Sequence, residues 1–192
     1  MTPKTLFERL PVTRRCGACD LCCTAMSVAE LKKPAGMRCV HLQGSPGTSC
    51  SIYADRPYVC AEFACMWRGS DTLLSDGYYP AKCGFVIALS SGVSDRPVIL
   101  TVHPNPDFPD SWKQPRHRET FRKLAQTFNA IVVVGEHHLA RHIFTPIGNE
   151  YTKQSHPEYF KDNGARIGAP ETDFLPHHLT NEEMVWLLFG KP

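Results

Sequence analysis

The feature that most constrains this chain is the placement of its cysteines. Nine cysteines lie between Cys16 and Cys83, and none follows Cys83 in a sequence of 192 residues. The first stretch, MTPKTLFERLPVTRR, lacks the long apolar core of a secretory signal, because Lys4, Glu8 and Arg9 interrupt it. We therefore expect a cytoplasmic protein, in which thiols stay reduced. An odd number of cysteines in that compartment argues against a disulfide framework and favours bound metal.

The first four cysteines form a run of closely spaced thiols, RRCGACDLCC. A C-x2-C step lets a tight turn aim two thiolates at one metal ion, as in zinc fingers and iron–sulfur proteins. The run begins like a ferredoxin motif, but Cys23 follows Cys22 directly, where that motif has three spacer residues and then Cys-Pro. The candidate metal ligands are the eight cysteines that precede Cys83: Cys16, Cys19, Cys22, Cys23, Cys39, Cys50, Cys60 and Cys65.

The adjacent pair Cys22–Cys23 restricts how these ligands can be shared. Neighbouring side chains on an extended backbone point to opposite sides, so the pair would chelate a single ion awkwardly. Either each thiolate serves a different ion, or the pair sits on a polynuclear centre with bridging sulfurs. Eight cysteines match two four-thiolate sites in number. We expect two zinc ions, or iron held directly or in an iron–sulfur cluster.

The segment DRPYVCAEFAC predicts a short helix that begins near Asp55 and Pro57. Cys60 and Cys65 are five residues apart, and five residues turn an α-helix by about 140° beyond a full turn. The two thiols would then face different directions on one helix. Either the helix breaks near Cys65, or the two thiols bind different ions.

The eight cysteines and the segment CSIYADRPYVCAEFAC resemble a bacterial cysteine-cluster family of zinc- or iron-chelating domains. The resemblance covers residues 14 to 68, where Tyr53, Arg56 and Pro57 accompany the thiols as signature residues. It implies metal chelation through those cysteines and leaves the choice of metal open. Arg56 is a candidate donor to a sulfur or to the backbone, or else a partner in a surface ion pair with Asp55 or Glu62. A related cysteine block occurs in flagellin lysine methylases, but no further feature of this chain indicates methyl transfer.

Three classes of function fit the pattern. We favour a non-enzymatic protein with a structural or metal-handling role, because sites made wholly of cysteine leave no open coordination position. The alternative is an iron–sulfur protein with a redox or enzymatic role. The third is a metal-stapled module that presents a surface to an unidentified protein partner. The sequence shows no phosphate-binding loop, nucleophile elbow or kinase-type motif, so no enzymatic activity is assigned.

Local patterns divide the chain into two regions and predict an α+β fold. Residues 1–70 are rich in turn-forming stretches, and we expect a loop-rich cysteine module that bound metal holds together. Residues 71–192 are expected to be a small mixed α/β supporting region, with a few antiparallel strands and two to three helices; the two regions may equally be halves of one domain. The expected strands are 84–90, 97–103, 131–135 and 141–148, and the expected helices are 116–130, 180–190 and a short amphipathic one near residue 1.

Charge and hydropathy limit the partners. The net charge is +2 with both signs interspersed, so no nucleic-acid partner is expected. No apolar run is long enough to cross a bilayer, so no membrane partner is expected either. We expect solvated surface at the short basic clusters Arg14–Arg15 and Arg116–Arg118. The one partner that the sequence indicates is a metal ion.

Isolated residues carry weaker signals. Cys83 opens a predicted strand, and a lone cysteine there is usually a small core residue. His138 and His142 have the spacing of a zinc-binding helix but lack the glutamate of the H-E-x-x-H motif, so we expect surface or core histidines. Tyr78 and Tyr79 are expected to pack between the two regions.

Overall fold

The computed structural model describes residues 12–44, 50–90, 98–136, 139–157 and 160. Three of the expected features fall outside these residues: the helix near residue 1, the helix over 180–190, and His138.

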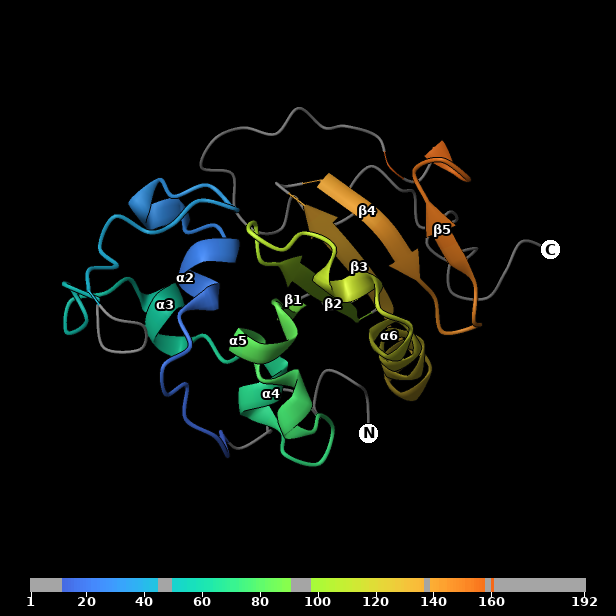
Figure 1. Ribbon diagram of the computed structural model, residues 1–192, viewed down its shortest axis with the longest axis horizontal. Helices are drawn as coiled ribbons and strands as arrows, with labels where there is room; N and C mark the ends of the chain where they lie inside the picture. Colours follow the sequence, from blue (N-terminus) through green and yellow to red (C-terminus); the bar gives the residue numbers. More distant parts are fainter. Residues whose placement is uncertain (1–11, 45–49, 91–97, 137–138, 158–159, 161–192) are drawn as a thin grey trace.

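A five-stranded mixed sheet lies at the centre of the described fold (Figure 1). Its strands follow one another across the sheet in chain order. The second and third strands are parallel, and the other neighbours are antiparallel. The fold is therefore α+β, as the sequence predicts. The strands are β1 (Phe85–Ser90), β2 (Ile99–Pro104), β3 (Ile131–Glu136), β4 (Leu139–Phe144) and β5 (Glu150–Thr152).

The parallel pair of β2 and β3 is connected by a crossover through the long helix α6 (Pro115–Phe128). Parallel strands need such a crossover, whereas a hairpin turn can join antiparallel strands. Pro115 suits the first turn of α6, because its missing N–H would have no partner inside the helix. Asn129 ends the helix in the left-handed conformation, with φ of 46°, and its N–H donates to the Gln126 carbonyl at 3.3 Å.

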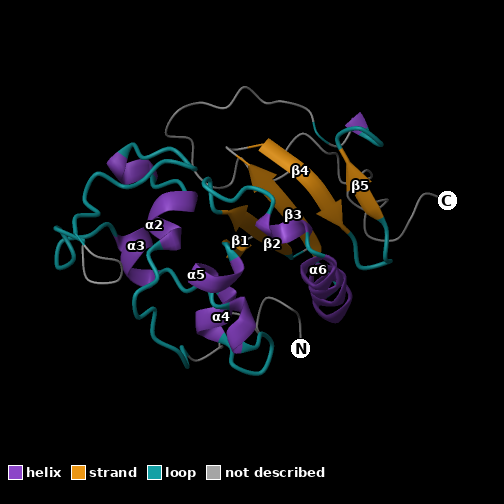
Figure 2. Cartoon of the chain, in the orientation of Figure 1, coloured by secondary structure: helices purple, strands orange, loops and turns teal. Residues whose placement is uncertain are grey.

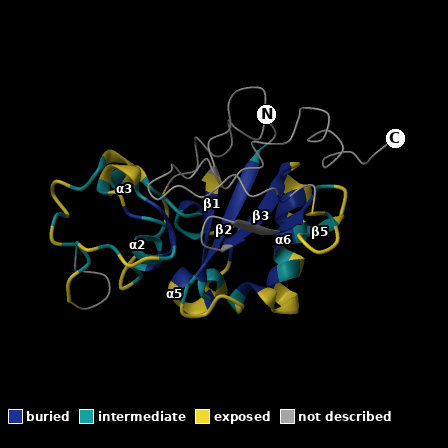
Figure 3. Ribbon diagram, turned by 90° about the horizontal axis from the view of Figure 1, so that it is seen from above, coloured by how far each residue is buried: buried dark blue, intermediate teal, exposed yellow. Residues whose placement is uncertain are grey.

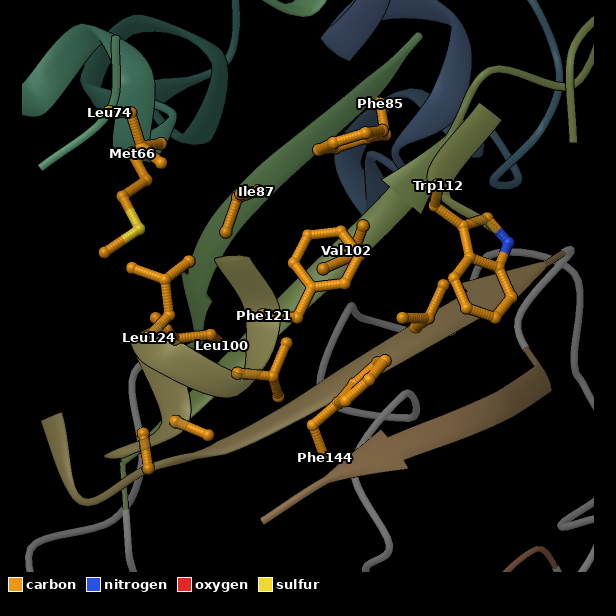
Figure 4. Close-up of a cluster of buried hydrophobic side chains, with 14 of the residues drawn as sticks. Met66, Leu74, Phe85, Ile87, Leu100, Val102, Trp112, Phe121, Leu124 and Phe144 are labelled. Atoms are coloured by element: carbon orange, nitrogen blue, oxygen red, sulfur yellow. The ribbon is translucent and has the colours of Figure 1, made fainter. Parts of the chain in front are cut away.

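The main hydrophobic core lies between one face of the sheet and α6 (Figure 4). The Phe121 ring meets the rings of Phe85 and Phe144 edge to face, with centroids 5.4 and 5.6 Å apart. β2 is buried along its whole length, which explains its continuous apolar sequence (Figure 3). The apolar face that the helical period predicts for α6 is confirmed as buried: Phe121, Leu124, Ala125 and Phe128.

Short helices and turns make up the region that carries the cysteines (Figure 2). Two of them, α2 and α4, pack directly against β1 at the edge of the sheet. The short α-helices are α2 (Leu21–Ala25), α3 (Tyr58–Glu62), α4 (Met66–Gly69) and α5 (Pro80–Cys83). Single 3-10 turns are η1 (Ala29–Leu31), η2 (Asp76–Tyr78) and η3 (Ser111–Lys113).

Arg14 was expected at the solvated surface, but the structure uses it to tie the start of the cysteine region to α4. Its Nη1 donates to the carbonyls of Trp67, Ser70 and Leu74, each at 2.9 Å. The guanidinium also lies 4.8 Å from the centre of the Trp67 ring and pairs with Asp76. A guanidinium has five N–H donors in a fixed plane, which suits a cluster of carbonyls better than a solvated position.

Arg118 was also expected at the surface, but it joins a half-buried ionic cluster beside β4. Arg118 and Arg122 pair with Glu150, whose Oε2 also lies 3.0 Å from Nε2 of His142. Burial alone would raise the pKa of Glu150, but hydrogen bonds from Arg118 and His142 and the charges of both arginines lower it overall. Burial lowers the pKa of His142, although Glu150 opposes that shift. This histidine is thus a core residue, one of the two placements the sequence allows.

We expect the free energy of unfolding to fall as the pH drops below about 6.5. Burial lowers the pKa of both His117 and His142, so the unfolded chain takes up protons that the folded chain does not. The stability that these two histidines contribute is complete when the pH is above their pKa in the unfolded chain. It is lost as the pH falls toward their lower pKa in the folded chain. Each proton corresponds to a slope of at most about 1.4 kcal/mol per pH unit. Urea unfolding followed by tryptophan fluorescence should show this slope, and His142→Gln should reduce it; an unchanged slope in that variant would contradict the assignment.

Candidate metal centre

Helix α2 carries the adjacent pair Cys22–Cys23. The extended backbone expected here from the sequence is wrong, because the pair is helical. The segment is helical because Leu21, Ala25 and the following Met26 bury a common apolar face. Successive side chains of an α-helix leave it about 100° apart. The two thiols therefore still leave the backbone in different directions.

Four thiols gather where α2 and α4 meet β1, and three of them pack on one small apolar cluster. That cluster contains Val86 and Ala88 of β1, and Cys19, Cys22 and Cys65 lie against it. Burial raises the pKa of Cys19 to about 11, and the charges on Cys65 and Cys16 also raise it. Since Cys16 also acts on Cys22 and Cys65, these four thiols are electrostatic neighbours. We call them the inner group: Cys16, Cys19, Cys22 and Cys65.

Backbone donors are aimed at two sulfurs of the inner group. Burial is the largest influence on the pKa of Cys19, but hydrogen bonds from the backbone of Leu21 and Ala81 act against it. At Cys65 burial is again the largest influence, and hydrogen bonds from the backbone of Arg68 and Trp67 oppose it. Such N–H donors stabilise the charged form of a thiol, which is the form that binds metal. This donor set fits a thiolate-ligated ion.

A tight turn joins the first two thiols of the inner group. The Cys19 N–H donates to the Cys16 carbonyl at 3.0 Å, and Gly17 between them has φ of 55°. Glycine adopts that conformation without the steric penalty of a side chain. The Tyr79 ring lies tilted against that of Trp67, with centroids 4.7 Å apart, and its hydroxyl donates to the Cys16 carbonyl at 2.7 Å. Tyr79 thus packs between the two regions of the chain, as the sequence predicts.

The other four thiols are not among those that pack on the small apolar cluster at β1. The Cys39 N–H donates to the Cys23 carbonyl at 3.0 Å, so these two residues are held together. Burial raises the pKa of Cys60, and the charges on Cys23, Cys39, Glu30 and Cys50 raise it further. Cys60 is therefore near enough to each of the other three thiols for their charges to interact. We call them the outer group: Cys23, Cys39, Cys50 and Cys60.

Cys22 and Cys23 stand at the junction of the two groups. A hydrogen bond with Cys23 is the largest cause of the raised pKa of Cys22, followed by burial. The same hydrogen bond lowers the pKa of Cys23 to about 7, and the charges of Lys33 and Arg38 lower it as well. The protonation states of these two neighbouring thiols are therefore linked, which is compatible with two neighbouring ions or with one bridged centre.

The chain breaks between Cys60 and Cys65, as one of the two sequence-based alternatives requires. Helix α3 follows Pro57 and ends at Glu62, and Cys65 directly precedes α4. Phe63 lies between the two helices with an extended backbone, φ −62° and ψ 124°. The break places Cys60 in the outer group and Cys65 in the inner group. The other sequence-based alternative, that the two thiols bind different ions, therefore fits as well.

Cys83 lies beside the inner group but belongs to the main core. Its side chain is 4% exposed, and its thiol donates to the carbonyls of Phe85 at 3.3 Å and Tyr78 at 3.5 Å. Burial raises its pKa to about 11, and the nearby charges on Cys19 and Cys65 also raise it. A protonated thiol engaged with two carbonyls is a core residue rather than a ligand, as the sequence predicts.

In the described part of the chain, no three Cys, His, Asp or Glu side chains already surround a single-ion position. The thiols of each group are neighbours, but their sulfurs do not converge on one point. Metal binding by either group would therefore require rotations of the thiol side chains or small shifts of the loops.

Lys33 is a residue of this region that the sequence analysis missed. Its side chain is buried, with the residue 6% exposed, and its ammonium donates to the carbonyls of Thr24 at 3.3 Å, Pro34 at 3.2 Å and Met26. Its charge acts on Cys23 of the outer group. A lysine in a turn-rich sequence is expected at the surface, so its burial becomes evident only in the folded chain, where three carbonyls accept from its ammonium.

Arg56 contacts Tyr53 rather than a sulfur. Its guanidinium lies 3.9 Å from the centre of the Tyr53 ring and donates to the Tyr53 carbonyl. The two signature residues therefore brace the turn that precedes α3.

We expect Lys33→Met to weaken metal binding by the outer group about tenfold or more. A unit charge near a thiolate site contributes about 1–3 kcal/mol at an effective dielectric constant of about 20, and methionine keeps much of the aliphatic stem. A competitive zinc titration of the full chain measures the affinity. Lys32→Met is the matched control, because Lys32 is the exposed neighbour. Equal affinities for wild type and Lys33→Met would contradict a role for this charge.

No protein-family model matches the chain, and comparisons with curated proteins and with solved structures find no match. The resemblance to the cysteine-cluster family therefore stays a prediction. Over the residues that the structure describes, no helix combines the length and the apolar character needed to cross a membrane.

Proposed function

We propose that this chain is a cytoplasmic metal-binding protein that holds zinc or iron through its eight clustered cysteines, without a catalytic role. The observation that carries the proposal is the spatial sorting of the eight thiols. Cysteines spread over 50 positions of the sequence, from Cys16 to Cys65, lie near enough in the folded chain for their charges to interact: Cys19 with Cys16 and Cys65, and Cys60 with Cys23, Cys39 and Cys50. Four thiolates are the ligand number of a closed zinc site.

The local chemistry supports thiolate ligands at both groups. Backbone N–H groups are aimed at two inner sulfurs, and the buried ammonium of Lys33 acts on an outer one. A four-thiolate zinc site carries a net charge of −2, so donors and cations nearby lower the cost of burying it. The short helices of this region have a thin core of their own, and bound metal would supply folding free energy.

An iron–sulfur protein with a redox or enzymatic role is the second candidate. The adjacent thiols Cys22 and Cys23, whose protonation is linked, favour it, because neighbouring sulfurs suit a polynuclear centre. Such a centre would need inorganic sulfide beside the cysteine thiolates and would absorb visible light. The protein partner, if there is one, is not specified by either candidate.

X-ray absorption at the metal edge tests the proposed ligand set. For the zinc-loaded chain we expect a first shell of sulfur only, at about 2.3 Å. A metal–metal distance in the second shell would favour the bridged centre instead. Nitrogen or oxygen as the main first-shell neighbours would contradict binding by the eight cysteines.

A further inference from the structure

We propose that the two groups hold metal unequally: the inner group keeps its ion as part of the fold, and the outer group exchanges its ion with solution. This inference rests on the proposed metal-binding function and adds a division of roles within it. The outer group would then be the position at which the protein takes up and releases a thiophilic divalent ion such as zinc.

The inner group is built into the packing of the sheet edge. Leu21, Ala25 and Met26 of the α2 segment pack on Val86 and Ala88 of β1, and all five are at most 6% exposed. Cys19, Cys22 and Cys65 lie against this same cluster. Opening the inner group would expose the cluster to water, at a cost of about 25 cal/mol for each Å² of apolar surface.

Hydrogen bonds hold the remaining parts of the inner group. Tyr79 donates to the Cys16 carbonyl, and Arg14 ties the chain just before Cys16 to three carbonyls of the α4 region. The backbone N–H groups of Thr13 and Arg14 both donate to the Arg68 carbonyl, at 3.2 and 3.3 Å. Releasing an ion from this group therefore requires several contacts to break together.

The outer group is carried by segments without a core of their own. None of the described residues in 37–44 and 50–62 is buried (Figure 3). Large apolar side chains in these segments face solvent: Met37, Val40, Tyr53, Tyr58 and Val59 are 47–80% exposed. Cys50 is connected to Leu42 by an isolated bridge rather than by a strand. Segments with little buried apolar surface open locally at low free-energy cost.

The two groups thus share the junction at Cys22 and Cys23 but differ in what must open to free an ion. At the outer group, Cys50 and Cys60 can move with their exposed segments, while Cys39 is hydrogen-bonded to Cys23 of α2. At the inner group, Cys16 is the exposed ligand, whereas Cys19, Cys22 and Cys65 are held against the buried cluster at β1. Ion exchange should therefore be much faster at the outer group.

A chelator competition measures this difference. The full chain is loaded anaerobically with two equivalents of zinc and mixed with excess 4-(2-pyridylazo)resorcinol, whose zinc complex is coloured. We expect two phases of equal amplitude with rates at least tenfold apart. Cys39→Ser should remove the fast phase and leave the slow one. Cys83→Ser is the matched control and should keep both phases.

The outcomes separate this inference from the proposed function. A single phase that releases two ions would overturn the inequality while leaving metal binding intact. Loss of both ions in Cys39→Ser would overturn it too, in favour of one bridged centre. Survival of the fast phase in that variant would place the exchangeable ion elsewhere and overturn the assignment. Failure of the wild type to retain any zinc would instead contradict the proposed function with zinc as its metal.

Discussion

In Cys22→Ser, the cysteine region is expected to lose its fold, and the metal content is expected to fall from about two ions per chain to less than one, because the ligands of both groups lie in that region. Cys22 packs on the cluster that joins α2 to β1, so its loss removes an inner ligand where metal and packing support each other. Binding of a structural zinc ion contributes about 10–16 kcal/mol to the folding of small zinc-finger peptides, so losing a ligand is costly. Limited trypsin digestion with mass spectrometry should show cleavage before residue 70 at least tenfold faster than in wild type.

The sheet should survive this change, because its main core does not involve Cys22. Fragments that retain β2, α6 and β3 should accumulate in the digest. Cys83→Ser is the control and should keep the wild-type metal content. Full metal content in Cys22→Ser, with residues 12–70 as protected as in wild type, would argue against a metal staple.

Phe121→Ala is expected to lower the free energy of unfolding by about 3–5 kcal/mol. Phe121 is 0% exposed, and its ring fills the space between α6 and the sheet against Phe85 and Phe144. Removing the ring loses its burial and leaves a cavity that the rigid sheet cannot close. For a chain of this length the midpoint of thermal unfolding should fall by about 10 °C.

Circular dichroism at constant metal loading measures this effect. The matched control is Phe108→Ala, because Phe108 is 65% exposed and its loss should change stability by less than about 0.5 kcal/mol. The folded Phe121→Ala chain should bind as much metal as wild type. If Phe121→Ala lost metal while its free energy of unfolding stayed at the wild-type value, the assignment of Phe121 to the core would be contradicted.

The supporting sheet was largely predictable because its signals are local. Alternating and continuous apolar runs located β1, β2 and β3 within two residues, and the period of α6 predicted its buried face. The parallel pairing of β2 with β3 was not predicted, since strand order depends on contacts between distant segments. Arg14 and Arg118 were misplaced for the same reason. Arginine is usually a surface residue, but in the fold Arg14 binds carbonyls and Arg118 binds a carboxylate that are distant in the sequence.

The candidate site was predictable in its membership but not in its arrangement. Spacing alone identified the eight cysteines as candidate ligands, and their number matches two four-thiolate sites. It did not reveal which thiols are neighbours, because Cys65 reaches Cys19 only through the packing of α2 and α4 on β1. The helical conformation at Cys22–Cys23 depends on the same packing. Lys33 carried no sequence signal, because its burial follows from a fold in which three carbonyls converge on its ammonium.

The most direct test of the account is elemental analysis with a visible spectrum, on the full chain purified without oxygen. The account predicts close to two metal ions per chain. A colourless protein with zinc would indicate two closed thiolate sites, whereas iron with acid-labile sulfide and a broad visible band would indicate the iron–sulfur candidate. A protein that holds neither zinc nor iron near stoichiometry would contradict the central claim.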